Sequence, residues 1–261
     1  LLSDFGAQSV TPASVEGLTY QFIKNATFVS INNQVAPFNL QQAAYLFKQS
    51  FKNFPEETIH FIMVDLYGNT SEEIIYVYEN KQHILCPNNG FITLLFQDSP
   101  VKLFKLNAKI NEPYNVKSLT KRYLETVEAI LQNEKEDVMD EVTADDILIK
   151  KSSQAFYNNN VLNATVLYID NFENVVLNVT KAYFEEVSMG RNFKLRLVGN
   201  DEITSISTHY NHVGVGEKLC RFNSANYLEI AINKGNAAGL FGFNLQNESS
   251  LLYQQVKIFF E

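Results

Sequence analysis

Two neighbouring side chains, Phe172 and Asn174, have the chemistry needed to recognise a flat heterocycle. They lie within residues 165–178, where β-branched residues flank a cluster of Asp and Asn that favours a tight turn between two strands. An aromatic face can stack on a purine, and a carboxamide offers both donors and an acceptor to its edge. Taken alone, the stretch favours a simpler interpretation, a hairpin whose Phe172 packs inward.

A carboxylate at the end of a strand is the candidate for reaction chemistry. Asp65 closes the apolar run that begins at His60, and a strand at residues 27–31 and a helix capped by Asn39 precede it. Strand, helix and strand in this order predict a βαβ unit and a parallel sheet. Ligands bind beyond the carboxyl ends of such strands, which is where Asp65 would lie; the alternative is an Asp that caps a loop. His60 is predicted to have a core or edge role.

The two halves of the chain differ in the elements that position these side chains. Helical and strand patterns alternate in the first half, whereas from about residue 155 short β-rich runs follow turn signals with no helix of ordinary length between them. We therefore predict an α/β domain at residues 1–150 with a mostly parallel sheet, followed by an all-β barrel domain at residues 151–261. The carboxylate-rich segment 134–146 is predicted to be a solvated connection, and a partly helical one is the alternative.

Composition excludes several classes of partner. The 261 residues are 46% hydrophobic and carry a net charge of −8, which argues against nucleic acid as a partner. No apolar run approaches the ~18 residues that would suggest a membrane span. No intact signal peptide is visible, and the chain begins with Leu1 rather than Met, which leaves open what precedes it.

Cysteine and histidine usage gives no metal signature. Cys86 and Cys220 lie far apart without a CxxC pair, so we expect neither a disulfide framework nor a zinc site, and a reduced, cytoplasmic protein. His209 and His212 could be taken for a metal pair. Because no carboxylate or Cys lies close to them in sequence, we expect no metal there.

Several short motifs occur in a fixed order along the chain. They are Asp4-Phe5-Gly6 followed by Gly17, Pro37-Phe38-Asn39, Phe54-Pro55 with the strand ending at Asp65, Pro87-Asn88-Asn89-Gly90, residues 168–174, and residues 223–238. In this order they resemble the motifs of the S-adenosylmethionine (SAM) hydroxide adenosyltransferase family, which also contains the fluorinase and the chlorinase. The resemblance extends from residue 2 to about residue 242.

The resemblance implies a fold, an assembly and a reaction. It implies an α/β domain followed by a β-barrel, assembled as a homotrimer with sites between the N-terminal domain of one subunit and the C-terminal domain of the next. It implies attack of water on the ribose C5′ of SAM, which gives adenosine and methionine without a cofactor or metal. The residues at matching positions are the catalytic Asp65 and the substrate-binding Asp4, Ser9, Phe172, Asn174, Ser224 and Tyr227.

The chain departs from the family where the attacking water should be held. Hydrolytic members hold it with an Asp, an Arg and a His; Asp65 keeps the first, but Glu72 and Leu119 fall at the other two positions. Lys121 and Arg122 would supply the missing charge if the alignment shifts slightly, although a solvated helix start is the preferred interpretation. Ser9 replaces an Asp that grips the ribose.

Two main functions follow from these departures. The first is a SAM hydrolase whose activity is weakened. The alternative is a non-catalytic homologue that keeps the fold, the trimer and an adenosine pocket. A third possibility is a related reaction on another nucleoside substrate, and we do not expect halogenation.

Overall fold

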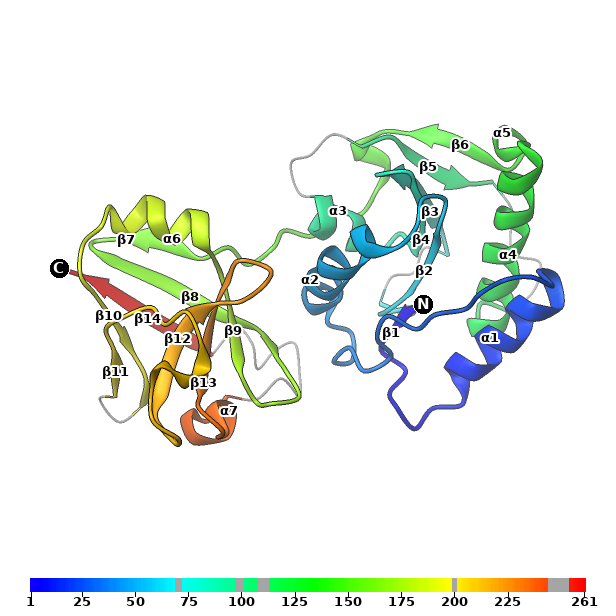
Figure 1. The fold of residues 1–261 in the computed structure, drawn as a ribbon. Helices are drawn as coiled ribbons and strands as arrows, with labels where there is room; N and C mark the ends of the chain where they lie inside the picture. Colours follow the sequence, from blue (N-terminus) through cyan, green and yellow to red (C-terminus); the bar gives the residue numbers. More distant parts are fainter. Residues whose placement is uncertain (69–71, 97–100, 108–112, 199–200, 244–253) are drawn as a thin grey trace. The chain divides into compact units, whose positions relative to one another are not determined.

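The computed structural model describes residues 1–68, 72–96, 101–107, 113–198, 201–243 and 254–261. The chain divides into two compact units, Leu1–Ser152 and Ser153–Glu261. Each unit has its own sheet and its own apolar core (Figure 1). No helix in the described ranges is both long and apolar enough to cross a bilayer.

The first unit is built on a six-stranded sheet in the order β1-β2-β4-β3-β5-β6. The neighbours β1, β2 and β4 pair in parallel, whereas β3, β5 and β6 are joined by antiparallel ladders. The sheet is therefore mixed, and the expectation of a mostly parallel sheet is wrong. The strands are β1 (Leu2–Ser3), β2 (Ile59–Met63), β3 (Ile74–Glu79), β4 (Gln82–Pro87), β5 (Leu103–Leu106) and β6 (Met139–Val142).

A two-residue turn explains why β3 and β4 are antiparallel. Asn80 and Lys81 join the two strands and have φ values of 51° and 57°. Two consecutive positive φ angles are typical of the tight hairpin turns that match strand twist. Parallel neighbours would need a long crossover connection, for which two residues leave no room.

Helices cover both faces of this sheet (Figure 1). Ile62 and Val64 belong to the core that contains α2 and α3 side chains, whereas Phe61 and Met63 belong to the core that contains α1 and α4 side chains. This alternation follows from the period of two along a strand. The predicted cap at Asn39 is confirmed, because its side chain accepts from the backbone N–H of Gln42. The helices are α1 (Thr11–Phe22), α2 (Leu40–Ser50), η1 (Phe51–Asn53), α3 (Phe91–Phe96), α4 (Val116–Gln132), α5 (Lys135–Val138) and η2 (Ala144–Asp146).

Two segments of the first unit differ from expectation. Residues 27–31 are not a strand, although the N–H of Ile31 donates to the carbonyl of Leu1 and so keeps the segment beside β1. The acidic segment 134–146 is more than a solvated connection, because β6 pairs with β5 and buries Met139. The charged residues of β6 suit a sheet edge, where they discourage pairing with another chain.

The second unit is a nearly closed, barrel-like sheet of eight strands (Figure 1). All of its strand ladders are antiparallel within the described residues, in the order β11-β10-β14-β8-β9-β13-β12, with β7 on β8. A bridge between Ile206 and Cys220 links the segment after β11 to β12, at the two ends of this order. The strands are β7 (Phe156–Asn158), β8 (Val161–Ile169), β9 (Val175–Thr180), β10 (Phe193–Arg196), β11 (Glu202–Ile203), β12 (Lys218–Phe222), β13 (Tyr227–Ile232) and β14 (Gln255–Phe260).

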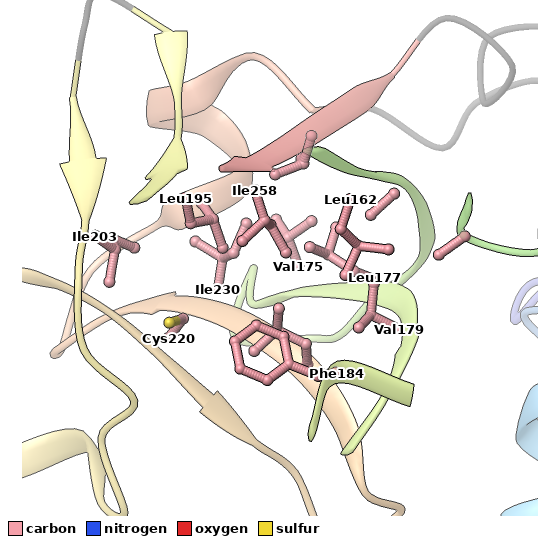
Figure 2. Packing of buried hydrophobic residues seen from close by; sticks show 14 of the residues in the cluster. Leu162, Val175, Leu177, Val179, Phe184, Leu195, Ile203, Cys220, Ile230 and Ile258 are labelled. Atoms are coloured by element: carbon pink, nitrogen blue, oxygen red, sulfur yellow. The ribbon is translucent and has the colours of Figure 1, made fainter. Parts of the chain in front are cut away.

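Inward-facing aliphatic side chains fill this unit. Figure 2 shows Leu162, Val175, Leu195 and Ile258, from four different strands, gathered in its interior. A helix of eight residues between β9 and β10, α6 (Lys181–Ser188), adds Phe184 to the same core, although the sequence suggested no helix of ordinary length here. The shorter helices are η4 (Tyr210–His212) and α7 (Ala237–Phe241). Both cysteines are free and buried.

Candidate functional site

Asp65 lies in a tight bend just beyond the carboxyl end of β2. Its φ of 52° is left-handed, a conformation that Asp and Asn tolerate better than most other residues. The Asp4 carboxylate accepts from the backbone N–H of Asp65 at 3.1 Å and from that of Phe38 at 3.0 Å. Asp4, predicted to bind substrate, therefore links the loop that contains Asp65 to the loop that contains Phe38. Its carboxylate fixes the backbone from which the Asp65 side chain extends.

Asn89 and Gly68 also constrain the position of Asp65. The Asn89 side chain donates to the carbonyl of Val64 at 2.9 Å and to that of Asp65 at 3.2 Å. Gly68 passes so close that an added Cβ would lie 2.2 Å from either carboxylate oxygen of Asp65. A side chain at position 68 would force the carboxylate to move, so glycine is needed for this geometry.

Burial sets the electrostatics of Asp65, whose residue is 7% exposed. Desolvation raises the pKa of its carboxyl group, the nearby Asp4 carboxylate raises it further, and Lys150 opposes the shift. The Lys150 Nζ lies 3.8 Å from Asp65 Oδ2. A carboxylate that has lost part of its hydration is a stronger proton acceptor, as a base that activates water requires.

The positions aligned with the missing Arg and His have other roles. Leu119 is fully buried on α4 among apolar side chains that include Leu66. Arg122 is buried rather than solvated, and its Nη1 donates to the carbonyl of Glu72 at 2.9 Å. Because Arg122 is buried, the interpretation of residue 122 as part of a solvated helix start is wrong. The hydrogen bond also brings its guanidinium beside Glu72, the residue aligned with the family's Arg.

Ser9 has a local role at the start of α1. Its Oγ donates to Thr11 Oγ1 at 2.9 Å and accepts from the backbone N–H of Thr11 at 3.2 Å. The hydroxyl therefore stabilises the first turn of the helix.

The turn between β8 and β9 is organised by Asp170. Its carboxylate accepts from the backbone N–H groups of Phe172 and Asn174 at 2.8 and 2.9 Å, and from Asn174 Nδ2 at 2.9 Å. Phe172 is 75% exposed, so the interpretation in which it packs inward is wrong. Asn174 is buried beside it, and its amide nitrogen is directed to Asp170. The turn presents an exposed aromatic face on a rigid loop.

The structure separates this turn from Ser224 and Tyr227. Tyr227 pairs with Thr180 at the far end of β9, whereas Asn174 immediately precedes the near end at Val175. At about 3.4 Å per residue, the six residues from Asn174 to Thr180 separate the two positions by roughly 20 Å along the strand. Ser224 is exposed in the turn before β13. Within this unit, the turn with Phe172 and the pair Ser224 and Tyr227 can therefore contact only different parts of an extended ligand.

A cavity of about 400 Å³ lies at the opposite end of β2. Glu57 and His60 contribute to its lining, and Asp65 does not. His60 is buried against Phe47 and hydrogen-bonds to Gln82 Oε1, and burial lowers its pKa to about 4. A neutral, aromatic-packed histidine matches the predicted core role.

Metal-binding groups do not gather in the described part of the chain. His209 and His212 pack with ring centroids 5.3 Å apart. No group of three His, Cys, Asp or Glu side chains suited to a metal occurs among the described residues.

The chain matches two family models. Residues 1–137 match the SAM hydroxide adenosyltransferase N-terminal domain, and residues 164–250 match the C-terminal domain. A curated relative, the (R)-S-adenosyl-L-methionine hydrolase of Methanocaldococcus jannaschii, is 21% identical over 97% of this chain and 95% of its own length.

Two solved structures share the fold. An uncharacterised conserved protein from Thermotoga maritima is 21% identical, with a TM-score of 0.82 over 98% of both chains. A conserved hypothetical protein from Thermus thermophilus is 20% identical, with a TM-score of 0.70 over all of this chain and 97% of its own.

Proposed function

Because the chain belongs to the SAM hydroxide adenosyltransferase family, we propose that it hydrolyses SAM slowly to adenosine and methionine. The oxygen of a water forms a bond to ribose C5′ while the C5′–S bond breaks. The bonding pair goes to sulfur, so methionine leaves as a neutral thioether that needs no general acid. The water gives up its proton to a base. The curated relative, named as a SAM hydrolase, supports this reaction class.

The placement of Asp65 is the observation that carries the proposal. Its carboxylate is buried, its backbone is fixed by Asp4 and Asn89, and its pKa is raised by desolvation. Such a group can accept a hydrogen bond from water and then its proton at near-neutral pH. Fixing the carboxylate in advance also aligns the water with the C5′–S bond, which is the main contribution that a protein makes to such a displacement.

The residues around Asp65 favour slow turnover. Leu119 is buried in the core and cannot exchange a proton, and Glu72 reverses the charge of the Arg with which it aligns. Losing a positioning group can cost on the order of 10²-fold in rate. We therefore expect turnover that is weak and dependent on Asp65.

The exposed Phe172 favours a second function, binding of adenosine or SAM without catalysis. An exposed aromatic ring on a rigid turn suits stacking on adenine whether or not a reaction follows.

The family resemblance also predicts a homotrimer, and sedimentation giving a monomer at micromolar concentration would contradict it.

Adenosine release from saturating SAM tests the reaction. We expect slow release by the wild type and a further loss of about 10²-fold or more in Asp65→Asn, because an amide cannot take up the proton of the water. Asp140→Asn, at an exposed position on β6, is the control and should leave the rate unchanged. Release that survives Asp65→Asn would exclude this mechanism. Adenosine binding without any release would favour the second function.

A further inference from the structure

A cation close to Asp65 comes from a segment that no motif marks. Lys150 lies near the end of the first unit, and its Nζ is 3.8 Å from Asp65 Oδ2. We propose that Lys150 is the positioning residue that keeps Asp65 ionised and helps to hold the attacking water, in place of the family's Arg. This inference rests on the proposed hydrolysis and names the second polar group of the same site.

The backbone of Lys150 is fixed by two hydrogen bonds to one side chain. Its N–H donates to Thr93 Oγ1 at 3.0 Å, and the single hydroxyl proton of Thr93 is shared between the carbonyls of Gly90 at 2.9 Å and Lys150 at 3.1 Å. Two residues earlier, the N–H of Leu148 donates to Asn88 Oδ1 at 2.8 Å. The segment is therefore docked on the start of α3 and the turn before it, so the ammonium group extends from a fixed point.

Gly90 leaves the space through which the lysine stem passes. An added Cβ there would lie 2.6 Å from Lys150 Cγ and 2.8 Å from its Cβ, and the φ of 94° is one that other residues rarely adopt. The preceding residue, Asn89, holds the carbonyl of Asp65. One turn, residues 87–90, thus positions both charged groups, which gives the Pro-Asn-Asn-Gly motif a physical role.

The distance between the two charges suits a shared water. A separation of 3.8 Å is too long for a direct hydrogen bond and short enough for one water to contact both groups. A water that donates to Asp65 and accepts from Lys150 keeps one lone pair free to attack carbon. The lysine side chain is 36% exposed and that of Asp65 is 9% exposed, so solvent screens the pair only in part.

Lys150 also opposes the effects that favour a protonated Asp65. Burial and the Asp4 carboxylate raise the pKa of Asp65, whereas the lysine charge lowers it. Arg122 is held at the carbonyl of Glu72, and Lys105 pairs with Glu73. Removing the lysine charge should therefore raise the pKa of Asp65 and leave less of the base ionised at a given pH.

Three variants separate charge from packing. Lys150→Met keeps the stem and removes the charge, Lys150→Arg restores the charge, and Lys151→Met changes an exposed neighbour as the control. The first readout is the pH profile of adenosine release. We expect Lys150→Met to lower kcat by about tenfold or more with a smaller change in KM, and to move the acid limb toward higher pH. Lys150→Arg should recover part of both, and Lys151→Met should match the wild type.

The second readout does not require turnover. The carboxyl carbon of Asp65, assigned by its loss in Asp65→Asn, is followed by NMR as the pH is changed. We expect its midpoint to move furthest to higher pH in Lys150→Met, less in Lys150→Arg, and not at all in Lys151→Met. An unchanged midpoint in folded Lys150→Met overturns the inference, and so does an unchanged pH profile. If the wild type releases no adenosine, the proposed hydrolysis fails, while the NMR midpoint still decides whether Lys150 controls Asp65.

Discussion

The Asp65 cluster and the Asp170 turn each centre on an aspartate, but they are assembled in opposite ways. The Asp170 carboxylate accepts hydrogen bonds from groups two and four residues away, and it forms a rigid loop for Phe172. Asp65 is held by Asp4, 61 residues earlier, and it lies near Lys150 at the end of the unit. The Asp170 turn is a local structure, whereas the Asp65 cluster exists only when the whole first unit is folded.

The two aspartates also differ in what their carboxylates do. The Asp170 oxygens are occupied by three N–H donors, so this carboxylate supports the turn. The Asp65 residue is fixed mainly through its backbone, which leaves its carboxylate beside Gly68 and Lys150. A side chain held in this way can be directed at a substrate, at the cost of desolvating a charge.

The largest change in stability should come from Leu119→His, which places the family's His at its aligned position in the first unit. Leu119→His puts a polar ring into an apolar cluster, and we expect it to lower the free energy of unfolding by about 2–4 kcal/mol without raising adenosine release. Leu131→His, on the exposed side of the same helix, should cost far less. Urea unfolding measures both. A stable Leu119→His variant with faster release would show that position 119 faces the substrate.

Asp65→Asn should change the free energy of unfolding by a smaller amount and in the opposite direction. Folding raises the pKa of this carboxyl group, so its contribution to stability is fully present below the unfolded pKa and is lost as pH rises through the folded value. Asp65→Asn avoids that loss and also suits the left-handed φ. We expect it to be about 0.5–1 kcal/mol more stable than the wild type at pH 7, with the gain shrinking toward pH 4.

Thermal melting of the wild type and Asp65→Asn between pH 4 and pH 7 measures this difference in stability. Asp140→Asn, at an exposed position, is the control. A variant less stable than the wild type at pH 7 would mean that the carboxylate makes stabilising contacts that outweigh its desolvation.

The smallest effect should be confined to the local turn. Phe172→Ala removes an exposed stacking face, worth about 0.5–1.5 kcal/mol, so adenosine affinity measured by calorimetry should fall several-fold while the melting temperature stays the same. Phe156→Ala, at another exposed phenylalanine of the same unit, should change neither. Equal affinity in wild type and Phe172→Ala would remove the ring from adenine recognition.

Some features of this protein could be predicted from the sequence alone. The Asn39 cap and the turn at residues 170–174 depend on groups within a few residues of one another, so residue type and spacing suffice to predict them. Asp65 could be placed at a strand end because an apolar run stops there. The ordered motifs identified the family, which the matches to both domain models confirm.

Other features were decided only by the tertiary structure. The mixed sheet, the burial of Leu119, the separation of Tyr227 from Asn174 and the approach of Lys150 to Asp65 all depend on strand register and on how segments far apart in sequence dock. A slip of one residue in register moves every side chain of a strand to the opposite face. Local propensity carries no information about such partners, because their contacts form only when the sheet and both helical layers are packed together.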